Sequence, residues 1–205
     1  MALRLSELTF KTQDSKLSFE NTIEFYKTLY SRIVEFTGTT SDFSQLSTSD
    51  RKIMLSHNLE SICIVRMASN FHPQLSTNLD LEPLKIFFGP CPLKIEQIFN
   101  MPWAVDHDHV NLYCKTIDRL INLPEFDENT NVLFQMMVLL NTIGLKGSQV
   151  EEVSIVNQME EKCVALLLKY LKSKLGHLKA FTALHKYLDF LPILRILSDK
   201  IQRRR

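Results

Sequence analysis

Side chains able to carry out catalysis or bind a metal are few in this sequence and do not form a recognisable site. His107, Asp108 and His109 are consecutive, but adjacent ligands are a weak signal because a structural zinc site needs four. A polar helix start, with Asp108 near the N-terminus, explains the same residues. The sequence has no His-Glu-x-x-His, Gly-x-Ser-x-Gly or glycine-rich phosphate-binding pattern. We therefore predict no catalytic residue, no metal site and no enzyme.

The cysteines indicate a reducing compartment. No two of them have the Cys-x-x-Cys spacing, so buried free thiols are expected rather than disulfides or a zinc site. Asn-x-Ser/Thr acceptors and a signal-like apolar N-terminus are absent from the sequence, and no run reaches the roughly 18 apolar residues of a membrane span. We expect an intracellular protein with reduced cysteines at these positions: Cys63, Cys91, Cys114 and Cys163.

Arg66 is the charged residue whose position most needs an explanation, because it interrupts residues 62–68, which are otherwise apolar. An unpaired buried guanidinium is costly, so Arg66 must meet a carboxylate, backbone carbonyls, water or a ligand. Two interpretations remain open. Arg66 has a partner within the protein, or it is the polar anchor at the end of an apolar cavity.

Length and composition favour one helical domain over residues 1–205, with the structure of residues 1–16 left undetermined. The 205 residues are 45% hydrophobic and include only 5 Gly and 7 Pro, which favours long elements. The net charge of +1 gives no overall field that would attract nucleic acid.

Apolar residues at three- and four-residue steps predict the long helices. Ser47, followed by Asp50 three residues later, is a helix start signal able to satisfy free helix amides, and Phe43 and Leu46 are expected to pin the preceding loop into the core. Residues 62–68 should lie in a middle layer, because a helix that is apolar all round must be covered on more than one face. The predicted helices span 17–38, 48–69, 93–99, 107–122, 130–143, 150–175 and 177 to the end, bent at Pro192, with a β-hairpin over 74–90.

The stretch joining the first two long helices resembles the signature of the nuclear receptor ligand-binding domain. An aromatic residue ends one helix at Phe36, a Phe-x-x-Leu loop follows from Phe43, and Asp50 opens the next helix. Arg51 stands where the family has Gln. The Leu-Pro-Ile-Leu-Arg sequence at 191–195 resembles the family's dimerisation helix. The resemblance covers about residues 17–205 and implies an all-α, three-layer antiparallel helical sandwich of about eight helices with one small β-hairpin.

The resemblance also implies a lipophilic pocket. Arg66 falls where steroid-type members keep an arginine that holds the polar end of the ligand. Asn70 falls where retinoid-type members hold an acid with arginine, so that mode of binding is disfavoured. The ligand classes to consider are sterols, fatty acids and haem. The implied pocket residues are Phe25, Tyr26, Leu29, Arg66, Met67, Asn70, Phe87 and Phe88.

The same resemblance implies a groove for a coregulator helix, formed by Ile33, Arg51, Lys52 and Leu55. Departures from the family affect its ends: Gly38 replaces a lysine that grips the coactivator helix, Lys52 replaces an apolar residue, and Ser56 replaces a frequent basic residue. The chain stops at Arg205, where helix 11 of the family would end, so we expect no helix 12. These departures favour binding of a corepressor or dimer partner over coactivator recruitment.

Dimerisation is expected through the last helices. The implied role is that of a nuclear transcription regulator that pairs with itself or with another nuclear receptor, contacts DNA only through a separate domain, and does not associate with membranes. The alternative is an all-α protein-interaction adaptor with a filled core and no ligand. The expected interface residues are Leu178, Phe181, His185, Leu188 and Arg195.

Overall fold

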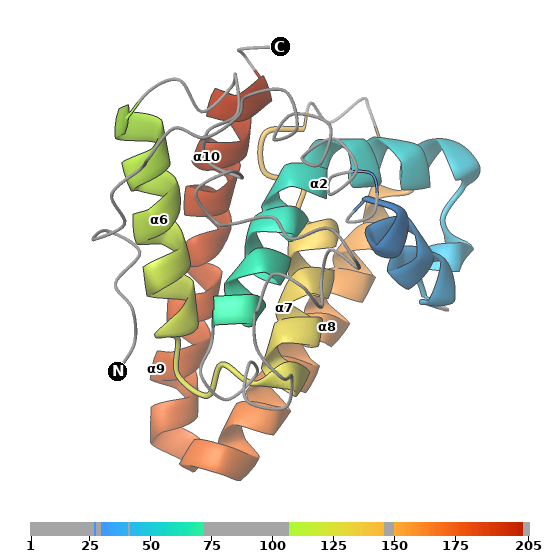
Figure 1. Ribbon diagram of the computed structural model, residues 1–205. Helices are drawn as coiled ribbons and strands as arrows, with labels where there is room; N and C mark the ends of the chain where they lie inside the picture. The colour runs from blue at the N-terminus through green and yellow to red at the C-terminus, as the bar shows by residue number, and fades with distance from the viewer. Residues whose placement is uncertain (1–26, 28–29, 41, 72–106, 146–149, 203–205) are drawn as a thin grey trace.

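The computed structural model describes residues 27, 30–40, 42–71, 107–145 and 150–202, and no strand occurs within these ranges (Figure 1). This part of the chain is all-α, as predicted. The hairpin expected over 74–90, the helix expected over 93–99 and residues 1–16 lie outside it. Besides the helical residues 30–39 and the 3-10 turn η2 (Phe43–Gln45), the helices are α2 (Thr48–Phe71), α6 (His107–Ile121), α7 (Glu128–Leu139), α8 (Val153–Leu175), α9 (His177–Leu188) and α10 (Phe190–Gln202).

Helix α2 is the element around which the described helices pack. It contacts α6, α7 and α10, which belong to distant parts of the sequence (Figure 1). The observed span agrees with the predicted 48–69. Its apolar interior is closed to solvent, which confirms that this helix is covered on more than one face; the buried residues are Ile62, Cys63, Ile64, Val65 and Ala68.

The loop before α2 is anchored as the sequence predicts. Phe43 and Leu46 are 3% and 2% exposed, so both side chains are in the core. The Ser47 hydroxyl accepts a hydrogen bond from the backbone N–H of Asp50 at 3.0 Å, which satisfies one free amide at the helix start. The loop and the first turn of α2 are therefore held in a fixed position.

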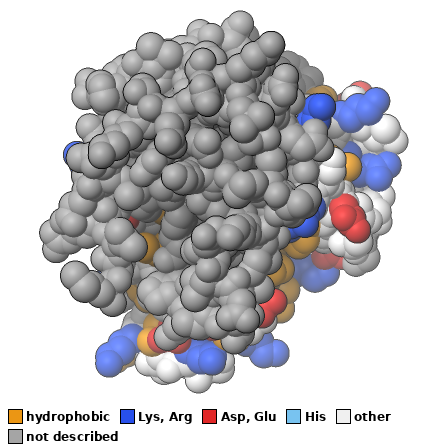
Figure 2. All heavy atoms as spheres, viewed as in Figure 1, with side chains coloured by type: hydrophobic (Ala, Val, Ile, Leu, Met, Phe, Trp, Pro, Cys, Tyr) orange, Lys and Arg blue, Asp and Glu red, His pale blue; other side chains and the backbone are white. Residues whose placement is uncertain are grey.

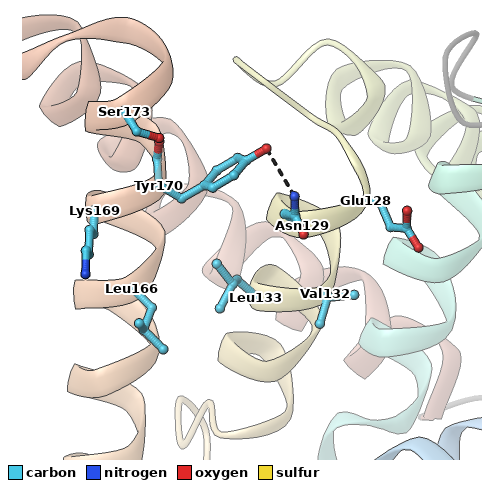
Figure 3. Close-up of a pocket in the computed structure, with 8 residues that line it drawn as sticks. All are labelled: Glu128, Asn129, Val132, Leu133, Leu166, Lys169, Tyr170 and Ser173. Atoms are coloured by element: carbon cyan, nitrogen blue, oxygen red, sulfur yellow. Dashed lines mark hydrogen bonds between the residues drawn. The ribbon is translucent and has the colours of Figure 1, made fainter.

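Helix α7 begins at Glu128, two residues earlier than predicted, because Asp127 forms a capping box with Thr130. The Asp127 carboxylate accepts from the Thr130 backbone N–H at 3.0 Å, and the Thr130 hydroxyl accepts from the Asp127 N–H at 2.8 Å. The Tyr170 hydroxyl of α8 donates to Asp127 at 2.6 Å. It also accepts from Asn129 at 3.2 Å, as Figure 3 shows. These bonds join the end of α8 to the start of α7.

The final helix predicted from residue 177 onward is two helices, which corrects the position of its bend. Helix α9 ends at Leu188 and α10 starts at Phe190, so the break lies at Asp189 and precedes Pro192. The proline ring clashes with the carbonyl four residues earlier, that of Leu188, and proline has no N–H to donate there. The break therefore falls one helical turn before the proline.

Charged side chains of both signs occupy the described surface in Figure 2, in keeping with the net charge of +1. Among the described residues, no helix combines the length and apolar character needed to span a bilayer. Cys63 and Cys163 are buried and form no disulfide. Burial raises the pKa of the Cys163 thiol, with a further rise from Asp42, so this cysteine is held in its protonated form.

Candidate functional site

A surface groove lies where the helical residues 30–39 meet η2 and the first two turns of α2. Its volume is about 250 Å³. Three of the residues predicted for a coregulator groove, Arg51, Lys52 and Leu55, line it together. The described residues that line it are Val34, Thr37, Gly38, Phe43, Thr48, Arg51, Lys52 and Leu55.

Local structure fixes the shape of this groove. Phe43 is buried and closes the groove on the core side, while Val34 is 52% exposed and presents an apolar rim. The Thr37 hydroxyl donates to the carbonyl of Val34 at 2.8 Å, and the Thr40 hydroxyl donates to that of Phe36 at 3.1 Å. These bonds satisfy carbonyls at the end of the helix and so stabilise that wall.

Among the described residues that line the groove, the two charged ones, Arg51 and Lys52, are both cations. Lys52 is exposed, and Arg51 donates from Nη2 to the Thr48 hydroxyl at 3.2 Å. The Nε of Arg51 is buried and has no hydrogen-bond partner within the described part of the chain. A Cβ added to Gly38 would meet no atom of the described residues within 4 Å, so within this part of the chain that corner of the groove is open. The groove is therefore apolar with a basic side.

Ile33, the fourth predicted groove residue, does not line this cavity. Its side chain is fully buried in the core. Because residues 33 and 34 point to different sides of the helix, Val34 occupies the groove position instead. Val34, Thr37 and Thr48 also line the groove but were not predicted from the sequence. Thr48 could have been predicted, because its helical spacing with Arg51, Lys52 and Leu55 places these four residues on one face.

The predicted ligand pocket is represented by one described side chain, Arg66. Burial lowers the pKa of its guanidinium, and the nearby Arg32 lowers it further, while Cys63 and Glu35 act in the opposite direction. Arg66 therefore faces charged groups at residues 32 and 35. Met67 and Asn70 lie on α2, but their side chains are outside the described part of the chain. The five other predicted pocket residues lie wholly outside it: Phe25, Tyr26, Leu29, Phe87 and Phe88.

An exposed apolar strip lies on α9 at the predicted dimer interface. Leu178 is 84% exposed and Phe181 is 39% exposed, His185 is exposed, and Leu188 is half-buried against the core. The Phe181 ring is partly covered by the ammonium of Lys172, 4.8 Å from its centroid. The strip therefore combines two exposed apolar side chains on one helix face.

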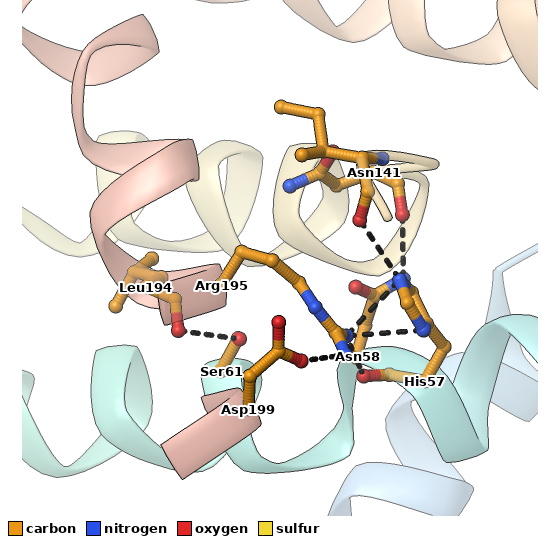
Figure 4. A network of polar contacts seen from close by, with 8 residues as sticks. His57, Asn58, Ser61, Asn141, Leu194, Arg195 and Asp199 are labelled. Carbon is orange, nitrogen blue, oxygen red and sulfur yellow. Dashed lines mark hydrogen bonds and ion pairs between the residues drawn. The ribbon is translucent and has the colours of Figure 1, made fainter. Parts of the chain in front are cut away.

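Arg195, also predicted for the interface, points into the molecule instead (Figure 4). Its side chain is 11% exposed and forms an ion pair with Asp199. Its Nη1 donates to the backbone carbonyl of His57 at 2.8 Å and lies 3.0 Å from the imidazole Nδ1. Arg195 thus connects α10 to α2, which explains its burial.

The same contact region involves the loop after α7. The amide of Asn58 donates to the carbonyl of Leu139 at 2.9 Å. It also donates to the carbonyl of Asn141 at 2.9 Å (Figure 4). The imidazole Nε2 of His57 lies 3.0 Å from the carbonyl oxygen of Ile143. Burial lowers the pKa of His57, and Arg195 adds to this effect against the opposing influence of Ile143 and Asp199. Neutral imidazole is therefore the favoured form.

No group of His, Cys, Asp and Glu side chains able to hold a metal ion occurs in the described part of the chain. The side chains of His107, Asp108 and His109 lie outside that part, although α6 begins at His107. The structure therefore does not test whether these three residues bind a metal or only form a polar helix start.

The central helix, the groove at its start and the broken final helix agree with the result of a family comparison. A model of the ligand-binding domain of nuclear hormone receptors matches residues 9–205 of this chain. The chain belongs to that family. No protein with a curated description matches the sequence significantly. Membership confirms the resemblance seen in the sequence.

Proposed function

We propose that this nuclear receptor ligand-binding domain binds a corepressor helix, rather than a coactivator helix, in the groove beside α2. The supporting observation is the groove lined by Val34, Phe43, Arg51, Lys52 and Leu55. Apolar residues of a helix can occupy such a trough. Its basic side suits the C-terminal end of a helix, where the dipole is negative.

Dimerisation through α9 completes the proposed role. The exposed apolar strip containing Leu178 and Phe181 would be covered by a second copy or by another nuclear receptor. A stable pair buries about 1,600 Å² in total, so further residues around this strip would also have to contribute. DNA contact belongs to a separate domain, and the protein acts in the nucleus.

A lipophilic ligand is the third part of the proposal. The family sandwich, with its hairpin, would place a sterol, a fatty acid or haem against Arg66. The partial burial of Arg66 on α2 supports a polar anchor there. No catalytic role is proposed for any residue.

The groove is tested by titrating a fluorescent corepressor peptide, taken from a receptor-interaction helix, and measuring anisotropy. Lys52→Glu places an acid beside the negative end of the peptide helix, and we expect a loss of affinity of about tenfold. Lys179→Glu, which alters another exposed lysine on α9, should leave affinity unchanged. Equal affinities for both variants and the native protein would reject this site. If no peptide or lipophilic ligand binds at all, the adaptor with a filled core becomes the better account.

A further inference from the structure

A second and larger groove lies between α7 and α8, away from α2. Its volume is about 610 Å³, within the range typical of binding sites. The apolar part is formed by Val132 and Leu133 of α7 and Leu166 of α8, with Tyr170 beside them (Figure 3). Val132 and Leu166 are 41% and 45% exposed. Two large apolar side chains therefore face solvent across one trough.

The wall that Tyr170 forms is held rigid. Its hydroxyl is bonded to both Asp127 and Asn129, and the ammonium of Lys174 lies 5.5 Å from the ring centroid. Burial would raise the pKa of the Asp127 carboxyl, but hydrogen bonds from Thr130 and Tyr170 outweigh it and lower the pKa. Asp127 stays ionised near neutral pH and keeps the ring in place. A preorganised wall reduces the entropy lost when a partner binds.

Opposite charges lie on the two sides of this groove. Figure 3 shows Lys169 on the α8 side, Glu128 on the α7 side, and the apolar Leu166, Leu133 and Val132 between them. A helix has a positive N-terminal end and a negative C-terminal end. Glu128 and Lys169 can each face the end of opposite sign. The α2 groove differs, because both of its charged lining residues are basic.

We propose that the α7–α8 groove docks an amphipathic helix from a partner protein. The docked helix runs from the α7 side of the groove to the α8 side. Its N-terminal end lies at Glu128 and its C-terminal end lies at Lys169, and its apolar face lies on Val132, Leu133 and Leu166. Glu128 also stabilises the start of α7 through the dipole of its own helix, but that role does not require Lys169 or the exposed leucine. The site is separate from the α2 groove, so its test is independent of the proposed corepressor site.

Two stapled helical peptides of about twelve residues serve as probes. Both have leucines at i, i+3 and i+4. The first has lysine in its N-terminal turn and glutamate in its C-terminal turn, and the second has these charges exchanged. The staple keeps both peptides helical. Binding is followed by fluorescence anisotropy and by methyl NMR shifts of Val132, Leu133 and Leu166. Thermal unfolding checks that each protein variant is folded.

The first probe should bind about tenfold tighter than the second, since each of its two ends is stabilised a few-fold. Combining Glu128→Lys with Lys169→Glu should reverse this preference, and Leu166→Glu should abolish the methyl shifts. Leu178→Glu and Lys52→Glu, at the other two surfaces, should change nothing. The proposal is overturned if neither probe shifts the three methyl groups, if the charge exchange has no effect, or if Lys52→Glu removes the binding.

Discussion

Asp50 and Glu152 exchange hydrogen bonds between the starts of α2 and α8, although they are far apart in sequence. The Asp50 carboxylate accepts from the backbone N–H groups of Glu151 and Glu152, at 3.1 and 2.9 Å. The Glu152 carboxylate accepts from the N–H of Ser47 at 2.7 Å. Each acid therefore satisfies amides at the beginning of the other helix. This exchange fixes α8 against the end of α2 that lines the α2 groove.

Asp50→Ala should destabilise the domain by about 2 to 4 kcal/mol, because it leaves two amides without their acceptor. The Asp50 side chain is fully buried, so water cannot easily replace it. Urea unfolding followed by circular dichroism measures the change. Glu151→Ala removes an exposed neighbouring acid and should have little effect. If Asp50→Ala and Glu151→Ala lowered the free energy of unfolding equally, the hydrogen bonds of Asp50 would not be a specific source of stability.

Acidification should weaken the domain through His57. The pKa of His57 is lowered from 6.5 in the folded protein, so below about pH 7 the unfolded chain binds more protons and stability falls as the pH falls. A single group contributes at most about 1.4 kcal/mol per pH unit. We expect His57→Gln to remove this part of the pH dependence, measured by urea unfolding between pH 7.5 and pH 5.5 (roughly the titration range of histidine). If the free energy of unfolding depended on pH in the same way in the native protein and in His57→Gln, His57 would not be the group responsible.

The α9 strip predicts a dimer that a single substitution separates. Leu178→Glu places a charge at the most exposed apolar residue of the strip, where it cannot disturb the core. Sedimentation velocity should then report a monomer. The structure makes Leu178 a cleaner choice than Leu188, which packs against the core. Leu166→Glu, at an exposed leucine on α8, is the matched control and should remain dimeric. If the native protein were itself a monomer, the proposed dimer interface on α9 would be wrong.

A bound lipophilic ligand should be detectable in two ways. Native mass spectrometry of the freshly purified protein would show added mass, and a ligand at 100 times its dissociation constant should stabilise the domain by roughly 2.7 kcal/mol. Arg66→Ala should reduce that gain, while Arg119→Ala, which removes an exposed arginine on α6, should not. If no sterol, fatty acid or haem in a screen stabilised the domain, a protein-interaction adaptor with a filled core would be the better explanation.

Sequence patterns predicted the features that depend on local interactions. The cap at Ser47, the anchoring of Phe43 and Leu46, and the span of α2 follow from helix periodicity and side-chain type, and the structure confirms them. The sequence indicated that Ser47 and Asp50 would satisfy free amides at the start of their own helix. The Ser47 hydroxyl does so, but the Asp50 carboxylate accepts from the amides of Glu151 and Glu152 at the start of α8. The sequence could not show this pairing, because it depends on how distant helices pack.

Some of the predicted site residues lie where the sequence suggested, and others do not. Family resemblance located Arg51, Lys52 and Leu55, which meet in one groove. It placed Ile33 and Arg195 at surfaces, whereas the structure turns Ile33 into the core and Arg195 toward His57 and Asp199. Side-chain direction on a helix is set by its neighbours in space. The α7–α8 groove had no sequence signal, since Val132 and Leu166 have the spacing of ordinary core residues.

The most direct test of the central claim is a transcription assay. The domain, fused to an unrelated DNA-binding domain, should lower expression of a reporter gene that carries the matching DNA site. Lys52→Glu should restore expression, because it removes the basic side of the α2 groove, and Lys179→Glu should not. A fusion that leaves the reporter unchanged, or one whose repression persists with Lys52→Glu, would contradict the account.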